Sequence, residues 1–157
     1  MATEDNKIKK GLYLLCSAVS LLIILDFILP GTRIEAEIQG LKTQKENYYN
    51  AAQNSHFSYK MKTSAGNFFV DENFSREARN HESIQFSKSL IFKEVNWYRW
   101  SAEDSKSYYV LRLLSAIALP LIILFAVFYT WRFKADIEIM FFILQILLIA
   151  DLIFVLQ

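Results

Sequence analysis

Three ionisable side chains lie inside the apolar runs of this 157-residue sequence: Asp26 in "LLIILDFILP" (21–30), Arg112 and Asp151. A charge near the centre of a bilayer costs about 2.5–3.5 kcal/mol and marks either a paired structural group or an ion or proton site. At a rise of about 1.5 Å per residue, Asp26 and Arg112 lie about 6 Å, and Asp151 about 9 Å, below the outer ends of their runs. This common depth predicts one intramembrane charge cluster. It would hold helices together or bind an ion, unless each charge reaches the interface separately.

No other residues have the spacing of a catalytic or metal site. His81-Glu82 is not an H-E-x-x-H motif, and His56 is the only other histidine. Four glycines in the chain argue against phosphate-binding loops, and the single Cys16 excludes a disulfide within the chain and a cysteine-based metal site. We therefore expect no enzymatic activity and no cofactor. The net charge of +1 argues against nucleic acid as a partner.

The apolar runs themselves predict three membrane spans, at 12–30, 108–131 and 137–157. Hydrophobic residues make up 54% of the chain and concentrate in these segments, each long enough to cross about 30 Å of hydrocarbon. The first run is too long for a signal peptide and has no A-x-A cleavage site, so it is interpreted as a retained anchor. A proline inside the second span, Pro120, predicts a bend in that helix.

Short flanking segments predict the orientation of the spans. Residues 1–11 contain Lys7, Lys9 and Lys10, and the turn at 132–136 contains Arg132 and Lys134. The positive-inside rule places both segments in the cytoplasm. The loop at 31–107 and the C-terminus are then extracytoplasmic. Aromatic residues predicted to anchor the chain at the membrane interface are Tyr13, Trp97, Trp100, Tyr108 and Trp131.

The loop at 31–107 has the pattern of a small mixed domain. Apolar residues at roughly helical spacing predict an amphipathic helix over 33–53. Alternating segments between about 56 and 99 predict three to five short antiparallel strands, with a polar loop and helical turn at 71–82. A sheet this small needs the helix, the membrane or a partner to cover one face. The motif "WYRW" (97–100) fits an aromatic-cationic ligand platform less well than an interfacial anchor.

The expected fold class is therefore an α+β membrane protein: three transmembrane helices with a small extracytoplasmic helix-plus-antiparallel-β domain between spans one and two. An abundance of Ile, Phe, Asn, Lys and Tyr resembles an AT-rich bacterial coding bias and favours the bacterial inner membrane. We expect a non-enzymatic accessory, assembly or scaffolding subunit, whose partners are the lipid bilayer and another membrane protein or further copies of the chain. The alternatives are an oligomeric channel or transporter component that uses Asp26, Arg112 and Asp151, and a membrane sensor whose loop domain binds a ligand.

Overall fold

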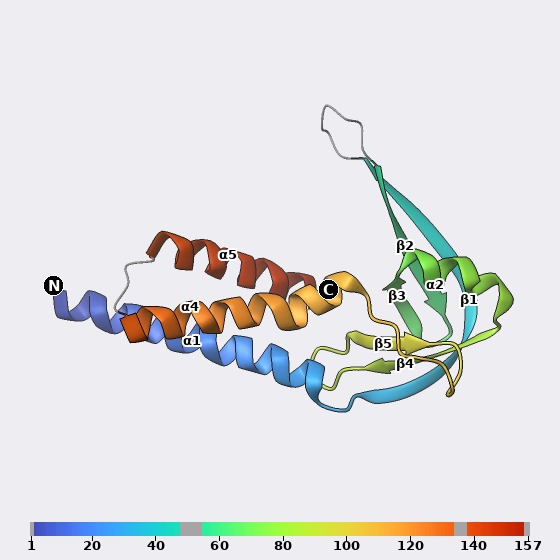
Figure 1. Cartoon of the computed structure of the whole chain (residues 1–157), viewed down its shortest axis with the longest axis horizontal. Helices are drawn as coiled ribbons and strands as arrows, with labels where there is room; N and C mark the ends of the chain where they lie inside the picture. Colours follow the sequence, from blue (N-terminus) through green and yellow to red (C-terminus); the bar gives the residue numbers. More distant parts are fainter. Residues whose placement is uncertain (1, 48–54, 134–137, 156–157) are drawn as a thin grey trace. The chain divides into compact units, whose positions relative to one another are not determined.

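A computed structural model of the chain describes residues 2–47, 55–133 and 138–155 (Figure 1). Its internal contacts divide the chain into two units. The helical unit comprises Met1–Pro30, Leu90–Phe92 and Leu113–Gln157, and the β unit comprises Gly31–Ser89 and Lys93–Arg112. Each unit has a hydrophobic core of its own. The mixture of helices with an antiparallel sheet that the sequence predicts is confirmed.

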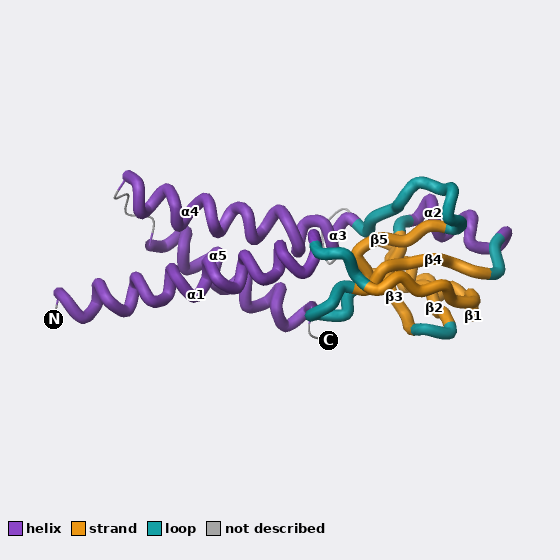
Figure 2. The backbone as a smooth tube through the Cα atoms, turned by 90° about the horizontal axis from the view of Figure 1, so that it is seen from below, coloured by secondary structure: helices purple, strands orange, loops and turns teal. Residues whose placement is uncertain are grey.

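Long helices build the helical unit, and they lie side by side in both Figure 1 and Figure 2. They are α1 (Ala2–Ile28), α4 (Leu119–Phe133) and α5 (Glu138–Val155). A short helix α3 (Val110–Leu113) and a π-helical turn (Leu114–Ala118) lead directly into α4. Lys9 forms an exposed ion pair with Glu138, so α1 and α5 approach each other near their N-terminal ends.

Each long helix buries one narrow stripe of side chains. In α1 the buried residues are Cys16, Ser20, Ile23 and Asp26, which follow one another at three- and four-residue spacing. The other faces are apolar and exposed, unlike the polar outer face of a helix in a soluble protein. The most exposed of these apolar side chains include Leu14 at 74%, Phe125 at 68%, Trp131 at 81% and Ile139 at 80%.

Two helices among the described residues are long and apolar enough to cross a membrane. They are Lys7–Ile28 and the continuous helix Val110–Phe133, which match the first two predicted spans. A signal sequence or the core helix of a soluble protein can have the same length and apolar composition. The third predicted span, 137–157, corresponds to α5, which is not one of these two helices; residues 137, 156 and 157 lie outside the described part of the chain.

The β unit is a five-stranded antiparallel sheet with the strand order β3-β2-β1-β4-β5 (Figure 2). Its strands are β1 (Thr32–Asn47), β2 (Ser55–Thr63), β3 (Gly66–Val70), β4 (Ser83–Lys88) and β5 (Val95–Arg99). The first half of β1 pairs with β4 and its second half pairs with β2. A register shift between Ile38 and Gly40 separates the two halves, as a glycine within a strand often does.

Alternation of side chains gives the sheet one apolar face. Helix α2 (Glu72–Glu77) and the 3-10 turn Ala78–Asn80 pack against this face. The buried core consists of Ala36, Met61, Phe68, Val70, Phe74, Ala78, Ile84, Phe86 and Tyr98. The opposite face carries mostly polar and charged side chains together with Phe69 and Trp97, as is common when one side of an antiparallel sheet is solvated.

Tyr98 is the largest side chain that is fully buried in this core, and its ring contacts Phe68 and Phe74. Its hydroxyl accepts a hydrogen bond from the Asp71 backbone N–H at 3.0 Å and donates to the Asp71 carboxylate at 3.2 Å. Burial raises the pKa of the Tyr98 phenol above its usual value. The phenol therefore stays protonated and hydrogen-bonded, and it fixes the start of α2 to the edge strand β5.

The predicted helix over 33–53 is wrong, because residues 32–47 form strand β1. Residues 48–53 of that prediction lie outside the described part of the chain. Ile34 and Ile38 are four residues apart, a spacing that fits one face of a helix and equally one face of a strand. Ala36 lies between them and is buried against the same core, which is the two-residue period of a strand. The pairing with β4 then satisfies the backbone of this segment.

Gly31 precedes β1 at a point where the backbone leaves no room for a side chain. A Cβ atom at this position would lie 2.1 Å from the backbone oxygen of Lys88 and 2.8 Å from the hydroxyl of Ser87. The nearest atom is backbone, so it cannot move aside without disturbing the pairing of β1 with β4. The sheet therefore requires glycine here for close approach rather than for a turn.

We predict that Gly31→Ala lowers the free energy of unfolding of the β unit by about 1–3 kcal/mol, the usual effect of overpacking. Thermal unfolding followed by the fluorescence of Trp97 and Trp100 in detergent micelles measures the change. Gly11→Ala is the matched control, because nothing lies within 4 Å of a Cβ atom there. Equal stabilities of the Gly31→Ala protein and the wild type would contradict the close approach.

Candidate functional site around Asp26

Asp26 ends the buried stripe of α1 and is itself fully buried, with 0% exposure. Its carboxylate accepts two backbone hydrogen bonds from the connection between β4 and β5. The N–H of Ile91 donates to Oδ1 at 2.7 Å, and the N–H of Phe92 donates to Oδ2 at 3.4 Å. Hydrogen bonds to an ionised acceptor are stronger than neutral ones. A carboxylate and two backbone amides, each costly to bury alone, therefore satisfy one another.

The connection at 89–94 is shaped to present these amides. At its base, the Ser89 N–H donates to the Glu94 carbonyl at 2.8 Å, and the Glu94 N–H donates to the Ser89 hydroxyl at 3.2 Å. Lys93 reverses the chain with a φ of 62°, in the left-handed region. Phe92 packs against the core of the helical unit. The closed base and the left-handed residue turn two successive N–H groups toward one carboxylate, as in other anion-binding turns.

Arg112 is also buried, with 6% exposure, but its assigned contacts belong to the β unit. Its Nε and Nη2 atoms donate to the side-chain oxygen of Asn96, at 3.3 and 3.0 Å. Asn96 lies on β5 and is buried as well. The guanidinium thus has a neutral amide acceptor that the sequence analysis did not identify.

Asp151, on α5, is in a different environment from Asp26. Its Oδ2 atom is buried and has no hydrogen-bond partner among the described residues. Elsewhere in the helical unit, Ser20 Oγ, Ser115 Oγ and Gln145 Nε2 are also buried without a hydrogen-bond partner among the described residues. They come from α1, the π-helical turn and α5, so the interior of the helical unit contains several polar atoms.

The predicted cluster of Asp26, Arg112 and Asp151 remains a prediction. The structure assigns Asp26 and Asp151 to the helical unit and Arg112 to the β unit. The partners it does give, two backbone amides for Asp26 and Asn96 for Arg112, were missed in the sequence. The segment 89–92 has the apolar pattern of a strand, and backbone donors leave no signal in a side-chain sequence. In the sequence, only the polar Asn96 among the inward-facing positions of strand β5 indicated a buried polar partner for Arg112.

The predicted bend at Pro120 coincides with a local change of helix type. Pro120 is fully buried in α4, and the π-helical turn Leu114–Ala118 ends two residues before it. The N–H of Leu119 donates to the carbonyl of Leu114, a five-residue step that widens the helix. Such turns adjust a helix where a proline removes a hydrogen bond, and they are frequent at functional sites.

The predicted interfacial aromatics occupy contrasting surroundings. Trp100 stacks between Phe74 and His81, with ring centroids 3.8 and 4.4 Å away, and its indole N–H donates to Glu77 at 3.1 Å. Trp97 lies on the other face of the sheet, with Lys106 Nζ 4.9 Å and Arg99 Cζ 5.3 Å from its ring. The stacking of Trp100 stabilises the β unit. Its role as a membrane anchor, like that of Trp97, remains a prediction.

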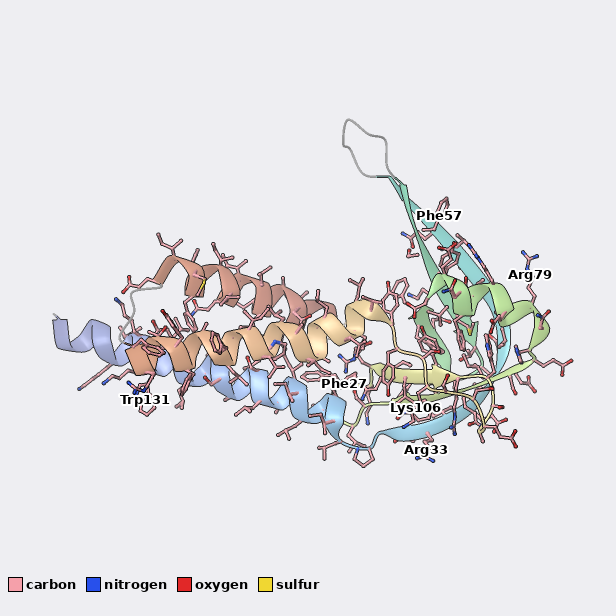
Figure 3. The ribbon with its side chains drawn as sticks, viewed as in Figure 1. Phe27, Arg33, Phe57, Arg79, Lys106 and Trp131 are labelled. Carbon is pink, nitrogen blue, oxygen red and sulfur yellow. The ribbon has the colours of Figure 1, made fainter. Side chains whose placement is uncertain are left out.

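The other three predicted anchors lie on or close to the long helices. Tyr13 of α1 makes an edge-to-face contact with Phe141 of α5, with 4.4 Å between ring centroids. Tyr108 is 36% exposed, just before α3. Trp131 is 81% exposed and points outward from the end of α4 (Figure 3). Exposure of this size on an apolar helix is compatible with an interfacial position.

Among the described residues, no group of three or more His, Cys, Asp or Glu side chains is placed to hold a metal ion. Comparisons of the chain with protein-family models, with curated proteins and with solved structures find no match. Function is therefore inferred from the geometry around Asp26 and from the surfaces of the two units.

We predict that Asp26→Leu destabilises the helical unit by about 2 kcal/mol or more, because two buried amides lose their acceptor. Asp26→Asn keeps a carbonyl oxygen at this position and should cost less. Unfolding of the purified protein by a denaturing detergent, followed by circular dichroism, compares the variants. If Asp26→Leu unfolds at the same detergent fraction as the wild type, the two amide bonds do not stabilise the fold.

Proposed function

We propose that this chain is a non-enzymatic, multi-pass membrane protein of the bacterial inner membrane that acts as an accessory, assembly or scaffolding subunit. Its three long helices would cross the membrane, with the N-terminus in the cytoplasm. The β unit and the C-terminus would be extracytoplasmic, and the β unit would be presented to a partner protein or to a second copy.

The observation that carries the proposal is the apolar outer surface of the helical unit. In the two span-length helices, only 22% and 33% of the most apolar window is buried. A core helix of a soluble protein would be mostly buried, and soluble monomers rarely expose contiguous apolar patches beyond a few hundred Å². Lipid, or lipid together with a partner helix, is the environment that such a surface requires.

The flanking charges support the proposed orientation. Lys9 and Glu138 pair at the ends of α1 and α5 that the positive-inside rule assigns to the cytoplasm. Since α1 and α5 begin at the same end and α4 runs between them in the chain, three crossings give the alternation that the proposal needs. Helix α5 would then be the third span.

A projecting ribbon of the β unit supports the presence of a partner (Figure 1). The ends of β1 and β2, residues 44–47 and 55–58, pair with each other and with no third strand among the described residues. A two-stranded ribbon is marginally stable alone. Phe57 lies on the ribbon face that continues the core and is 43% exposed (Figure 3). Leu41, which is 38% exposed, lies on the same face of β1 just before the ribbon. This apolar strip is the surface we assign to the partner.

The runner-up is a channel or transporter component, and one observation favours it: the buried Oδ2 atom of Asp151 without a hydrogen-bond partner within the described structure. Against it, Asp26 already accepts two amides and Arg112 donates to Asn96. Two of the three charges required for an ion path thus have structural partners.

We predict that the chain purifies from its native membranes in mild detergent as part of an assembly larger than its own 18.3 kDa, and that Phe57→Asp releases it. A charge on the apolar strip would remain solvated in the free protein but would be buried, unpaired, against a partner. Native mass spectrometry measures the assembly.

Lys42→Asp is the control, since Lys42 is also exposed but lies on the opposite face of the paired strands β1 and β2. A wild-type protein that purifies as a stable monomer would contradict the subunit role. Release by Lys42→Asp and not by Phe57→Asp would place the partner on the other face.

A further inference from the structure

The connection held by Asp26 has an apolar tip that its own unit leaves uncovered. Leu90 and Ile91 are 47% and 51% exposed, whereas the next residue, Phe92, packs into the core of the helical unit. All three residues are grouped with the helices by their contacts. Two large aliphatic side chains at the tip of a tight connection cost free energy in water, at about 25 cal/mol for each Å² of apolar surface.

Several backbone N–H groups of this connection have hydrogen-bond acceptors. The amides of Ile91 and Phe92 donate to Asp26, and those of Ser89 and Glu94 donate within the base of the turn. Non-helical backbone is tolerated at membrane depth only where the protein or water shields it from lipid and its polar groups have partners. The contact with Asp26 provides acceptors for two N–H groups of the tip, which lowers the cost of placing the tip near hydrocarbon.

The depth of the tip follows from the position of Asp26 in α1. Asp26 is two residues before the end of the helix at Ile28, about 3 Å along its axis. Leu22 and Leu25, exposed on the same helix, belong to the apolar surface that the proposed function places in lipid. Lys88 and Lys93 bracket the tip in the sequence, and long lysine side chains reach the interface from shallow positions.

We propose that Leu90 and Ile91 insert into the acyl-chain region of the leaflet in which α1 ends, as a shallow hydrophobic finger beside the spans. The finger adds a lipid contact formed by the β4–β5 connection rather than by a helix. Asp26 favours this insertion by accepting hydrogen bonds from two backbone N–H groups of the finger. The inference rests on the proposed membrane location and goes beyond it.

The test uses full-length protein in which Cys16 is replaced by serine and a single cysteine carries the environment-sensitive dye NBD. The cysteine is placed at Leu90, at Ile91, at Leu25 as the lipid-exposed reference or at Ser105 as the exposed reference in the β unit. The proteins are reconstituted into phosphatidylethanolamine–phosphatidylglycerol vesicles. A part of the lipid carries a doxyl quencher either near the headgroup or near the chain end.

The proposal predicts a blue-shifted emission at positions 90 and 91 and a loss of emission as large as that at position 25. The headgroup-proximal quencher should act more strongly than the chain-end quencher. Position 105 should keep its emission. Quenching at 25 with positions 90 and 91 behaving like 105 would overturn the finger while leaving the membrane location intact. Absence of quenching at position 25 as well would overturn both.

Discussion

A single buried carboxylate sets the main constraint on this chain. Asp26 lies on the inward stripe of α1, where an unpaired charge would be unfavourable, and it accepts the amides of Ile91 and Phe92. The backbone of a tight, apolar connection would be equally unfavourable without an acceptor. The carboxylate is tolerated because it accepts the two amides, and the amides are tolerated because they have this acceptor. These bonds join the tip of the β4–β5 connection to α1 within the helical unit. This aspartate inside an apolar helix therefore serves as a hydrogen-bond acceptor for backbone amides.

The two units differ in how polar their surfaces are. The long helices bury one stripe each and leave their other faces apolar, which suits lipid and not water. The β unit differs from the helical unit. One face of its sheet is covered by α2 and the stacked Trp100, and the other face is mostly polar. Leu41 and Phe57 continue its apolar face outward along β1 and β2. The proposed scaffolding role rests on this contrast between the apolar outer surface of the helical unit and the more polar surface of the β unit.

The sequence was sufficient for those features that depend on composition over long segments. Apolar runs identified the long helices, and alternation identified the strands after residue 55. It failed at 33–53, where Ile34 and Ile38 fit both periods and only the burial of Ala36 distinguishes them. The sequence marked Asp26 as unusual but did not identify its partners. These are the backbone amides of Ile91 and Phe92, which follow Asp26 by 65 and 66 positions, and a backbone amide leaves no signature in a side-chain pattern. Asn96 as the acceptor for Arg112 depends on β5 being in register with β4, which periodicity does not specify.

The most direct test of the Asp26 contact is the amide proton chemical shift of Ile91, measured by NMR on uniformly labelled protein in detergent micelles. A 2.7 Å bond to a carboxylate should place this resonance far downfield in the wild type. The account predicts that Asp26→Leu moves it strongly upfield and that Asp26→Asn moves it part of the way, with Phe92 following in the same direction. An Ile91 resonance that is unchanged in Asp26→Leu, with the helices intact by circular dichroism, would contradict the account.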